Sequence, residues 1–556
     1  MSRTLTARVA SEGVAIGPAA VIAAADVADD LATDRSFDDV AAATAARLTD
    51  AAATVRAEGR AEEAEVLEAY VLMAADPALA GGVATRTAEG APLVGAIRAA
   101  VAEVVAMFLA MEDEYFRQRA DDVAAVGREL VATVAGIDAS PTTLPDGAVV
   151  CARDLTPADT VHLDLARVAA IATEQGGPTS HTAIVARAAG IPAVVGATGL
   201  LAALEADPAA EVLVDAEGGA VVVGPDASAR EDASRRIEAA ARVAAEQRTY
   251  RGRRVTFAGR RILVAANVGG RGDVDGAVEA AADGIGLLRS EFLFLERGDA
   301  PDVDEQRDAY RAAVEAFEDP TIVRTLDIGG DKEVPYLRLP REENPFLGVR
   351  GLRLSLAEPA LFDTQLDALL GVADPHRLRV MLPMVSAVAD LEAGSARLEE
   401  RARLASTTPP PLGVMIETPA AALLAPALAR RAAFFSIGTN DLTQYVTAAD
   451  RTNAALGSHQ DAANPAVLQL IERTCRAADA AGIHVGVCGE AAGDPAVAAV
   501  LLGLGVTELS VASGRIDRTR WLVDQLDAER IREVAHEALS LPDADAVREL
   551  VAPLLP

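Results

Sequence analysis

The stretch Ile262-Leu-Val-Ala-Ala266 is the first of eight short apolar runs that alternate with helical patterns in the second half of the chain. The other seven are Gly284–Leu288, Ile322–Ile328, Leu378–Val385, Leu412–Ile416, Phe434–Thr439, His484–Cys488 and Glu508–Val511. Eight strand and helix units in succession are typical of a closed (β/α)8 barrel of the TIM type. The alternative is an open doubly wound sheet, whose glycine fingerprint residues 268–272 supply only in part. The pattern therefore favours a barrel over residues 251–556.

The first half of the chain has a different pattern. Residues 28–138 carry apolar residues every three or four positions, which predicts an almost unbroken helical region. Breaks are expected near Asp76-Pro77, Gly81-Gly82 and Gly90 to Pro92, so we expect a bundle of about four helices. Strand-like runs flank it at Val14–Val21, Ala148–Cys151, Val168–Ala172, Ala193–Val195, Val212–Asp215 and Ala220–Val223. The bundle is thus expected as an insertion into a small α/β domain of residues 1–27 and 139–224, with a linker helix over 225–250.

The length and cysteine content narrow the class of protein. At roughly 150 residues per domain, 556 residues predict three or four structural units. The three cysteines cannot form a disulfide framework in so long a chain, and they fit a reducing cytoplasm. The N-terminus superficially copies a signal peptide, but Glu12, Gly13 and Pro18 interrupt it, so strands are expected there. No uncharged stretch reaches the roughly 18 to 20 residues that span a bilayer, so membrane insertion is not expected.

The formal net charge is −32, and Lys332 is the single lysine among 51 basic residues. This charge argues against a broad polyanion-binding surface, so nucleic acid is not an expected partner. Such acidity suits a protein that works in high salt, where screening removes self-repulsion within a few ångströms. The shortage of lysine equally fits a coding bias, so both interpretations stay open.

A histidine stands at the start of a predicted helix in Gly176-Gly-Pro-Thr-Ser-His-Thr182. The glycines permit a tight turn, and Thr179 or Ser180 can cap the helix. At such a helix N-terminus, backbone N–H groups stabilise a phosphoryl anion. The alternative role for His181 is that of a residue that only helps to cap a buried helix.

This segment resembles the phosphohistidine motif of the phosphoenolpyruvate-utilising enzymes, which reads Gly-Gly-x-Thr-Ser-His followed by Ala-Arg and Ile-Pro-Ala. Here the three parts are Gly176 to His181, Ala186-Arg187 and Ile191 to Ala193. The resemblance implies that His181 is phosphorylated on Nε2, which forms a transferable N–P bond. The resemblance therefore favours His181 as a phosphoryl acceptor over His181 as a capping residue.

Charged and polar residues follow the proposed barrel strands, at the ends where barrel enzymes build active sites. They are Arg289, Glu291, Arg324, Asp327, Glu417, Asn440, Asp441, Arg451 and Cys488. Each alone could be an ordinary ion-pair or capping residue. Together they suit phosphoenolpyruvate, a compact trianion that favours the forks of Arg289, Arg324 and Arg451. Glu417 and Asp441 would supply hard oxygen ligands for Mg²⁺, which neutralises charge during phosphoryl transfer.

Loss of the phosphoryl group would leave the enolate of pyruvate, which must gain a proton on carbon, so a nearby acid is required. Cys488 is the candidate, in Gly486-Val-Cys-Gly-Glu490. A cysteine in an apolar strand is more commonly a packed, inert thiol. The flanking glycines and the position at a strand end favour the acid.

With Asn344-Pro-Phe-Leu-Gly348 and Asn440-Asp-Leu-Thr-Gln444 included, nearly the whole chain resembles the Enzyme I family of the bacterial sugar phosphotransferase system. The resemblance implies a swivelling phosphohistidine domain, a helical domain that docks the phosphocarrier protein HPr, and a barrel that binds phosphoenolpyruvate and forms a homodimer. It implies a cytoplasmic phosphotransferase that phosphorylates His181, then HPr, and releases pyruvate. The implied site residues are Arg289, Arg324, Asn440, Asp441 and Arg451 for phosphoenolpyruvate, Glu417 and Asp441 for Mg²⁺, and Cys488 as proton donor, with Thr160 a candidate partner of His181.

Four alternatives share some of these features. Pyruvate phosphate dikinase and phosphoenolpyruvate synthase need a nucleotide-binding domain before the histidine, but no Gly-rich nucleotide loop is visible there. A nitrogen-related Enzyme I would carry a further N-terminal sensory domain, which is not expected here. A catalytically dead scaffold would need only its packing residues, so retention of His181 and Cys488 argues against it. The carrier-docking residues stay open, with Leu67, Glu68 and Tyr70 as candidates.

Overall fold

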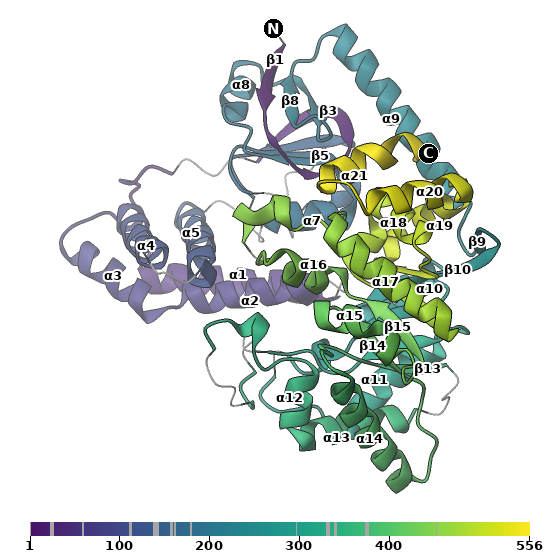
Figure 1. The fold of residues 1–556 in the computed structure, drawn as a ribbon. Coiled ribbons are helices and arrows are strands. Elements are labelled where there is room, and N and C mark those ends of the chain that lie inside the picture. The colour runs from purple at the N-terminus through teal and green to yellow at the C-terminus, as the bar shows by residue number, and fades with distance from the viewer. Residues whose placement is uncertain are drawn as a thin grey trace. The chain divides into compact units, whose positions relative to one another are not determined.

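The computed structural model describes residues 2–22, 27–57, 61–110, 114–136, 144–155, 159–160, 163–177, 181–295, 297–329, 334–337, 342–372, 377–451 and 453–556. They form two compact units, Met1–Arg242 and Val243–Pro556, which are described separately below (Figure 1). The first unit holds a mixed sheet and a helical bundle, and the second holds a barrel of parallel strands.

One eight-stranded sheet organises the first unit, in the order β1-β8-β7-β3-β4-β5-β6-β2. The strands are β1 (Arg3–Thr6), β2 (Arg8–Ser11), β3 (Val14–Ile22), β4 (Ala148–Ala152), β5 (Val168–Thr173), β6 (Ala193–Val195), β7 (Glu211–Asp215) and β8 (Ala220–Val223). The central strands β3 to β6 pair in parallel, and the outer ones pair antiparallel. The chain leaves the sheet after β3 and returns at β4, so the bundle is an insertion, as predicted.

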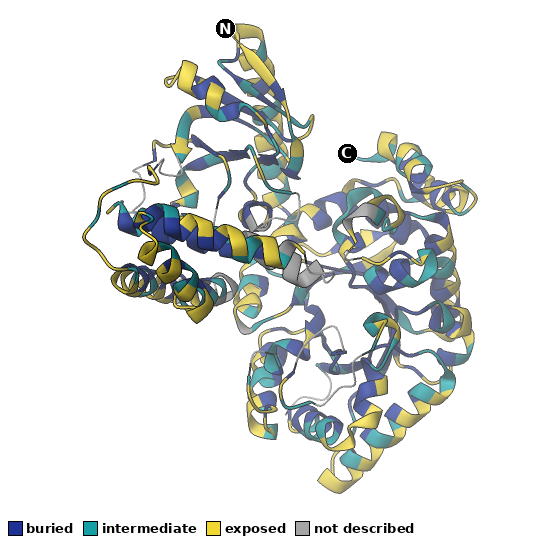
Figure 2. Cartoon of the chain, turned by 90° about the vertical axis from the view of Figure 1, so that its left-hand side faces the viewer, coloured by how far each residue is buried: buried dark blue, intermediate teal, exposed yellow. Residues whose placement is uncertain are grey.

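Both faces of this sheet are covered, which explains why β4 is apolar throughout. Val149 and Cys151 pack in one core with helix α8 (Leu200–Ala206), whereas Val150 packs in another core with helix α7 (His181–Ala189). The alternation follows from the two-residue period of a strand. Dark blue strands in Figure 2 mark this buried layer.

The bundle consists of α1 (Phe37–Ala57), α2 (Ala61–Ala74), α3 (Pro77–Ala88), α4 (Leu93–Leu109) and α5 (Glu114–Val134) among the described residues. The predicted breaks at Asp76-Pro77 and Gly90 to Pro92 are confirmed. The predicted break at Gly81-Gly82 is wrong, because α3 runs through both glycines. A side chain on Gly82 would lie 3.2 Å from Cβ of Ala100, so this glycine allows α3 and α4 to approach closely. Helix also begins at Phe37 rather than at residue 28.

Within the described residues, one segment, Val66–Ala88, has the length and hydropathy of a membrane span. It is divided between two helices, because α2 ends at Ala74 and Asp76 caps the start of α3. Leu67 and Val83, one from each helix, are fully buried in the bundle core. The apolar length of this segment therefore reflects the packing of two bundle helices.

The second unit is built on a closed barrel of eight parallel strands, because β17 pairs with β10 and β10 pairs with β11. The strands are β10 (Arg260–Val268), β11 (Ile285–Arg289), β12 (Thr321–Arg324), β13 (Leu378–Leu382), β14 (Leu412–Ile416), β15 (Phe434–Ile437), β16 (His484–Val487) and β17 (Glu508–Val511), with β9 (Val255–Phe257) antiparallel to β10. All eight predicted strands are present, so the predicted TIM-type barrel is confirmed and the open sheet is wrong.

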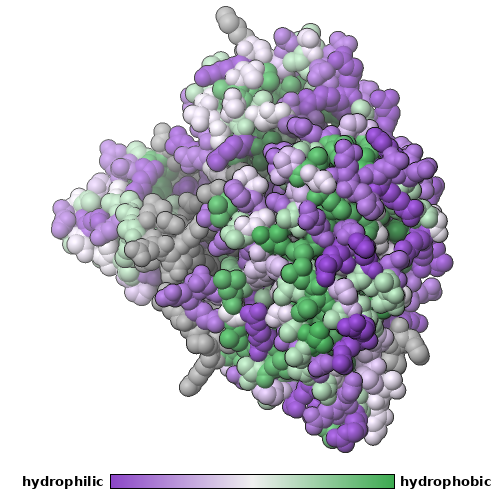
Figure 3. Space-filling model, viewed as in Figure 1, coloured by the Kyte–Doolittle hydropathy of each residue, from purple (hydrophilic) through white to green (hydrophobic). Residues whose placement is uncertain are grey.

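Helices cover the outside of the barrel. They are α10 (Arg271–Glu279), α11 (Val303–Glu315), α12 (Leu352–Ala357), α13 (Pro359–Leu370), α14 (Val388–Ala405), α15 (Pro419–Leu428), α16 (Thr439–Thr447), α17 (Pro465–Ala481), α18 (Pro495–Gly503), α19 (Ile516–Gln525), α20 (Ala528–Ala538) and α21 (Ala544–Val551). Their outer surface is partly apolar (Figure 3), and Leu404 of α14 and Leu423 of α15 are each more than half exposed. The barrel interior holds a separate apolar layer that includes Met415 and Phe434.

Helix α9 (Ala227–Arg248) has the position of the predicted linker. In the first unit, Arg236 of this helix pairs with Asp215 at the end of β7, with Nη2 and Oδ1 2.8 Å apart. In the second unit, the Tyr250 hydroxyl just after the helix donates to Asp524 at 2.7 Å. The linker therefore has polar anchors on both sides of the boundary between the units.

Candidate active site at the carboxyl ends of the barrel strands

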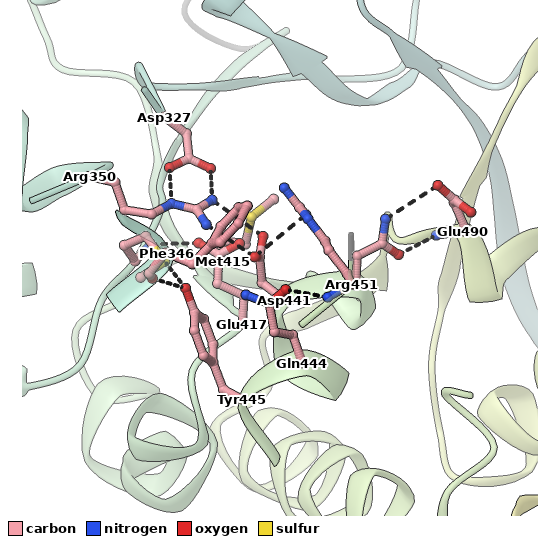
Figure 4. Close-up of polar contacts among 12 residues, drawn as sticks. Asp327, Phe346, Arg350, Met415, Glu417, Asp441, Gln444, Tyr445, Arg451 and Glu490 are labelled. Atoms are coloured by element: carbon pink, nitrogen blue, oxygen red, sulfur yellow. Dashed lines mark hydrogen bonds and ion pairs between the residues drawn. The ribbon is translucent and has the colours of Figure 1, made fainter. Parts of the chain in front are cut away.

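Three strands of the barrel deliver polar residues to one rim. Arg324 ends β12, Glu417 directly follows β14, and Asp441 lies in the first turn of α16 after β15. All eight strands are parallel, so their carboxyl ends meet at one rim. Figure 4 shows the carboxylates of Glu417 and Asp441 close together at this rim. Residues that are far apart in the sequence therefore meet at this rim, because each of them lies at or just after the end of a parallel strand.

A buried acidic triad, Asp327, Glu417 and Asp441, lies at this rim, with one carboxylate oxygen of each within 4.8 Å of the others. The Met384 backbone N–H donates to Glu417 Oε1 at 2.6 Å. Burial, together with the charges of Asp327 and Asp441, raises the pKa of Glu417 to about 8. Three hard oxygen donors fit a divalent cation. The triad is thus a candidate metal site, and it adds Asp327 to the predicted pair.

Arg350 was not found by the sequence analysis, yet it lies between two members of this triad. Its Nε and Nη2 donate to the two oxygens of Asp327 at 3.2 and 2.7 Å, and its Nη1 donates to Asp441 at 3.1 Å. Burial opposes its charge, but Asp327, Asp441 and Glu417 outweigh this effect and raise its pKa. Its signal in the sequence was weak because it lies in a loop rather than at a strand end.

The conformation of that loop depends on Gly351, whose φ is +58°. A side chain at Gly351 would also lie 2.8 Å from the Met384 side chain. Glycine therefore permits both the left-handed conformation and the close approach beside Arg350. An arginine followed by glycine, just after the Asn344 to Gly348 motif, is the pattern that could have indicated this residue.

Arg324 forms a second set of ion pairs at the rim. Its Nη2 lies 2.9 Å from Glu291 Oε1, and its Nη1 lies 3.2 Å from Asp327 Oδ2. Burial opposes its charge as well, but Glu291 and Asp327 outweigh this and raise its pKa. Glu291 also accepts from the Asp327 backbone N–H at 2.8 Å. The cationic and anionic groups at the rim are therefore held in fixed positions before any ligand arrives.

The other predicted ligand-binding residues are more accessible. Arg451 lies 3.5 Å from Asp441 Oδ1, and its guanidinium stacks over the Phe346 ring at 5.3 Å. Asn440 Oδ1 accepts from the Glu490 backbone N–H at 3.1 Å. Arg289 ends β11 with an exposed side chain. Asn440 and Arg451 also line a cavity of about 590 Å³, a volume that suits a small ligand.

Cys488 directly follows β16 and is 2% exposed, packed in the apolar layer of the barrel interior. Its backbone N–H donates to the Ile437 carbonyl at 3.1 Å. Burial raises the pKa of its thiol to about 11, although Ser436, Arg324 and Arg289 partly offset this. The thiol is therefore protonated at neutral pH, which a proton donor requires. A thiol that only packs in the core would be buried to the same extent. The charged groups that act on Cys488, however, are the rim residues Arg324, Glu417 and Arg289.

The predicted phosphoryl acceptor lies in the first unit, where α7 begins at His181. The His181 side chain and the predicted caps, Thr179 and Ser180, lie outside the described residues. The Thr182 hydroxyl donates to the Leu155 carbonyl at 3.3 Å, and Thr160 is buried. The contact predicted between Thr160 and His181 thus stays a prediction.

Two candidates for the carrier-docking face do not have the required exposure. Leu67 and Tyr70 are buried in the bundle core, at 0% and 1% exposed. They lie one helical turn apart on the apolar face of α2, which points inward. Glu68 is exposed and remains the candidate of that group.

Comparison with known families agrees with this architecture. Residues 243–528 match the PEP-utilising enzyme, PEP-binding domain; residues 144–219 match the mobile domain, and residues 6–119 match the N-terminal domain of PEP-utilising enzymes. The chain therefore belongs to the family of PEP-utilising enzymes.

Individual proteins similar to this chain indicate which kind of PEP-utilising enzyme it resembles. The phosphoenolpyruvate-protein phosphotransferase of Haloferax volcanii is 42% identical over 501 residues, which are 88% of this chain and 87% of that protein. The protein of the same name from Enterococcus faecalis is 36% identical and covers 99% of both chains. A solved structure described as the NMR solution structure of an Enzyme I protein is 30% identical, with a TM-score of 0.31, and covers 42% of this chain and 98% of its own. The two phosphotransferases match most or all of the chain, so the chain belongs among the phosphotransferases of this family.

Proposed function

We propose that this protein transfers the phosphoryl group of phosphoenolpyruvate to Nε2 of His181 and then to a histidine of the carrier HPr. Pyruvate is released, and the reaction is the first step of the sugar phosphotransferase system. The observation that carries the proposal is the rim of the barrel, where arginines, an acidic triad and a protonated thiol converge. Few ligands other than a small trianion with a metal ion suit that combination of charges.

Phosphoenolpyruvate binds at Arg289, Arg324, Asn440, Asp441 and Arg451 in this proposal. Arg289 and Arg451 support it because their side chains remain accessible at the rim and can close around a phosphate or carboxylate. Arg324 is held by Glu291 and Asp327, so it offers a rigid donor fork. Rigid and accessible arginines together allow entry of the ligand and then a fixed orientation.

Glu417 and Asp441 hold Mg²⁺ in this proposal, with Asp327 as a third oxygen donor. The all-oxygen donor set fits Mg²⁺, which binds carboxylates, water and substrate oxygens rather than nitrogen or sulfur. When bound, Mg²⁺ neutralises charge on the phosphoryl group. Arg350 neutralises Asp327 and Asp441 from the protein side, and so limits the repulsion among the three carboxylates.

Cys488 supplies the proton that turns the enolate into pyruvate. The bond between phosphorus and the enol oxygen breaks as the phosphoryl group passes to Nε2 of His181, and the electron pair stays on the enolate. The methylene carbon of the enolate then takes the proton from Sγ of Cys488, and the thiolate regains a proton from water. A thiol with a pKa of about 11 favours this return to the protonated form.

In this proposal phosphoenolpyruvate and HPr bind to different parts of the chain. The phosphohistidine domain therefore moves between them by swivelling near α9. The phosphohistidine domain comprises residues 1–27 and 139–224, residues 28–138 dock HPr, and residues 225–250 link the domains. Residues 251–556 bind phosphoenolpyruvate and form a homodimer in the cytoplasm. The exposed leucines of the barrel unit support an interface with a second copy.

Radiolabelled phosphoenolpyruvate tests the proposal directly. The full-length protein is incubated with ³²P-labelled phosphoenolpyruvate and Mg²⁺, next to His181→Ala, and the products are treated with acid or alkali. We expect acid-labile, alkali-stable label on the wild type alone, with pyruvate released in step. Label from ATP but not from phosphoenolpyruvate would instead indicate a nucleotide-driven relative. No label from either donor would indicate a scaffold without catalytic activity.

A further inference from the structure

Helix α5 of the bundle approaches the loop that lies beside the histidine helix. Arg128 on α5 places Nη2 3.8 Å from Oδ2 of Asp154, which follows β4 in the α/β domain. The two side chains are 41% and 32% exposed, so the pair lies at the edge of the contact. This ion pair joins the inserted bundle to the domain that carries His181.

From Asp154 the contact continues to the histidine helix itself. The other oxygen of Asp154, Oδ1, accepts from the Leu155 backbone N–H at 3.0 Å. The Leu155 carbonyl accepts from the Thr182 hydroxyl at 3.3 Å, and Thr182 is the residue after His181 in α7. Leu155 is also buried in one core with Ala183 of α7. One ion pair and two hydrogen bonds therefore connect Arg128 with the first turn of the histidine helix.

On the bundle side, α5 is held on both sides of Arg128. The Tyr70 hydroxyl of α2 donates to Asp122 at 3.0 Å, and Arg47 of α1 pairs with the buried Glu129. Both contacts lie within six residues of Arg128 on α5. Contacts with α1 and α2 therefore hold the part of α5 that carries Arg128.

We propose that Arg128, through Asp154, is a positioning residue that aligns the histidine helix with the bundle for transfer from phosphorylated His181 to the carrier. The inference rests on the proposed function, since it assigns carrier docking to the bundle. The first step needs His181 placed relative to the barrel, and the ion pair does not contribute to that placement. The second step needs His181 placed relative to the bundle, which is the relation that the pair sets. Arg128 therefore affects the second step only.

The two steps can be measured separately on the full-length protein. One rate is the phosphorylation of His181 by ³²P-labelled phosphoenolpyruvate in a rapid-quench experiment. The other is the loss of label from the phosphorylated enzyme to an excess of purified histidine-containing phosphocarrier protein. The variants are Arg128→Ala, Asp154→Asn and the double variant. Asparagine retains an acceptor oxygen for the Leu155 N–H, so it removes the charge and leaves the turn in place.

We expect transfer to the carrier to slow about fivefold in each single variant, the factor that corresponds to loss of a partly exposed ion pair. The double variant should be no slower than either single variant, because both changes remove one interaction. Phosphorylation by phosphoenolpyruvate should stay within about twofold of the wild type. Arg128→Lys, which keeps the charge, should recover most of the lost rate.

Other results would overturn the inference. Slowing of both steps to the same extent would indicate a structural role. Additive losses in the double variant would indicate that Arg128 contacts the carrier itself. Unchanged transfer in both single variants would also overturn it. Arg86→Ala is the matched control, because it removes an ion pair with Glu103 inside the bundle and should leave both rates unchanged. A wild type that takes no label from phosphoenolpyruvate would refute the proposed function instead.

Discussion

Arg350 and Asp327 are joined by two side-by-side hydrogen bonds at the rim of the barrel, at 3.2 and 2.7 Å. Both side chains are at most 5% exposed. Asp327 belongs to the acidic triad, and the same guanidinium also reaches Asp441 of that triad. One buried cation therefore fixes the geometry of two candidate metal ligands.

Removal of that cation should destabilise the barrel. In Arg350→Ala, Asp327 and Asp441 would lose a buried partner, a change that typically costs about 3–5 kcal/mol in the free energy of unfolding. Urea unfolding of the full-length protein, followed by tryptophan fluorescence from Trp521 in the barrel unit, measures this loss. Arg353→Ala is the matched control, because Arg353 is exposed and donates to the backbone carbonyls of Leu347 and Gly348 rather than to a carboxylate of the triad. Equal losses in the two variants would contradict a special role for Arg350.

The state of the Cys488 thiol can be tested by its reactivity. Burial raises its pKa to about 11, so the reactive thiolate is rare at neutral pH. Alkylation of Cys488 by iodoacetamide should be slow at pH 7 and accelerate about tenfold per pH unit up to pH 9.5, with peptide mass spectrometry as the measurement. A rate that levels off near pH 8.5 would show an ordinary thiol instead.

If Cys488 is the proton donor, its removal should lower turnover far more than the removal of a cysteine that only packs in the core. Cys488→Ala should lower pyruvate formation by about 10²–10⁴-fold, the range for loss of a general acid. Cys475 provides the control, because it is equally buried but lies in the core outside the rim. Cys475→Ala should leave pyruvate formation within a few-fold of the wild type. Comparable losses in both variants would assign the effect to packing.

Metal binding should depend on the triad. Chelation of divalent ions should abolish phosphorylation of the protein by phosphoenolpyruvate, and Mg²⁺ should restore it. Glu417→Gln and Asp327→Asn should each weaken binding of Mn²⁺, used as the paramagnetic probe in place of Mg²⁺, by at least about tenfold. Glu399→Gln, on the exposed face of α14, is the control and should bind Mn²⁺ as the wild type does. Unchanged affinity in Asp327→Asn would leave Glu417 and Asp441 as the ligands.

Acid should weaken the anchor of the linker helix. Hydrogen bonds from Arg236 and from the Gly218 and Glu217 backbones outweigh burial and lower the pKa of Asp215 to about 2, from an ordinary 3.8. The carboxylate therefore stabilises the folded state fully above pH 4, and this contribution is lost as the pH falls toward 2. Urea midpoints between pH 5 and pH 2.5 should fall less steeply in Asp215→Asn than in the wild type. The same slope in both proteins would contradict the pairing. Asp207→Asn, at an exposed position, is the control.

Much of the architecture could be predicted from the sequence. The eight apolar runs of the barrel and the strands around the bundle are local patterns, since burial of a strand in a parallel sheet requires a continuous apolar run. Strand ends also predicted Arg324, Glu417 and Asp441 as neighbours, because parallel strands share one rim. Gly81-Gly82 misled the helix prediction, because a glycine pair in a helix can serve close packing instead of a break.

The tertiary structure alone decided which charges pair. Arg350 lies in a loop with no periodic pattern, and its contacts with Asp327 and Asp441 span 23 and 91 residues of sequence. Arg128 and Asp154 likewise meet because the bundle returns to the sheet near the histidine helix. The sequence by itself determined the strands, the helices and the motif that contains His181, since these depend on neighbouring residues. Ion pairs between distant loops depend on how the packed elements place them, and no local pattern encodes that placement.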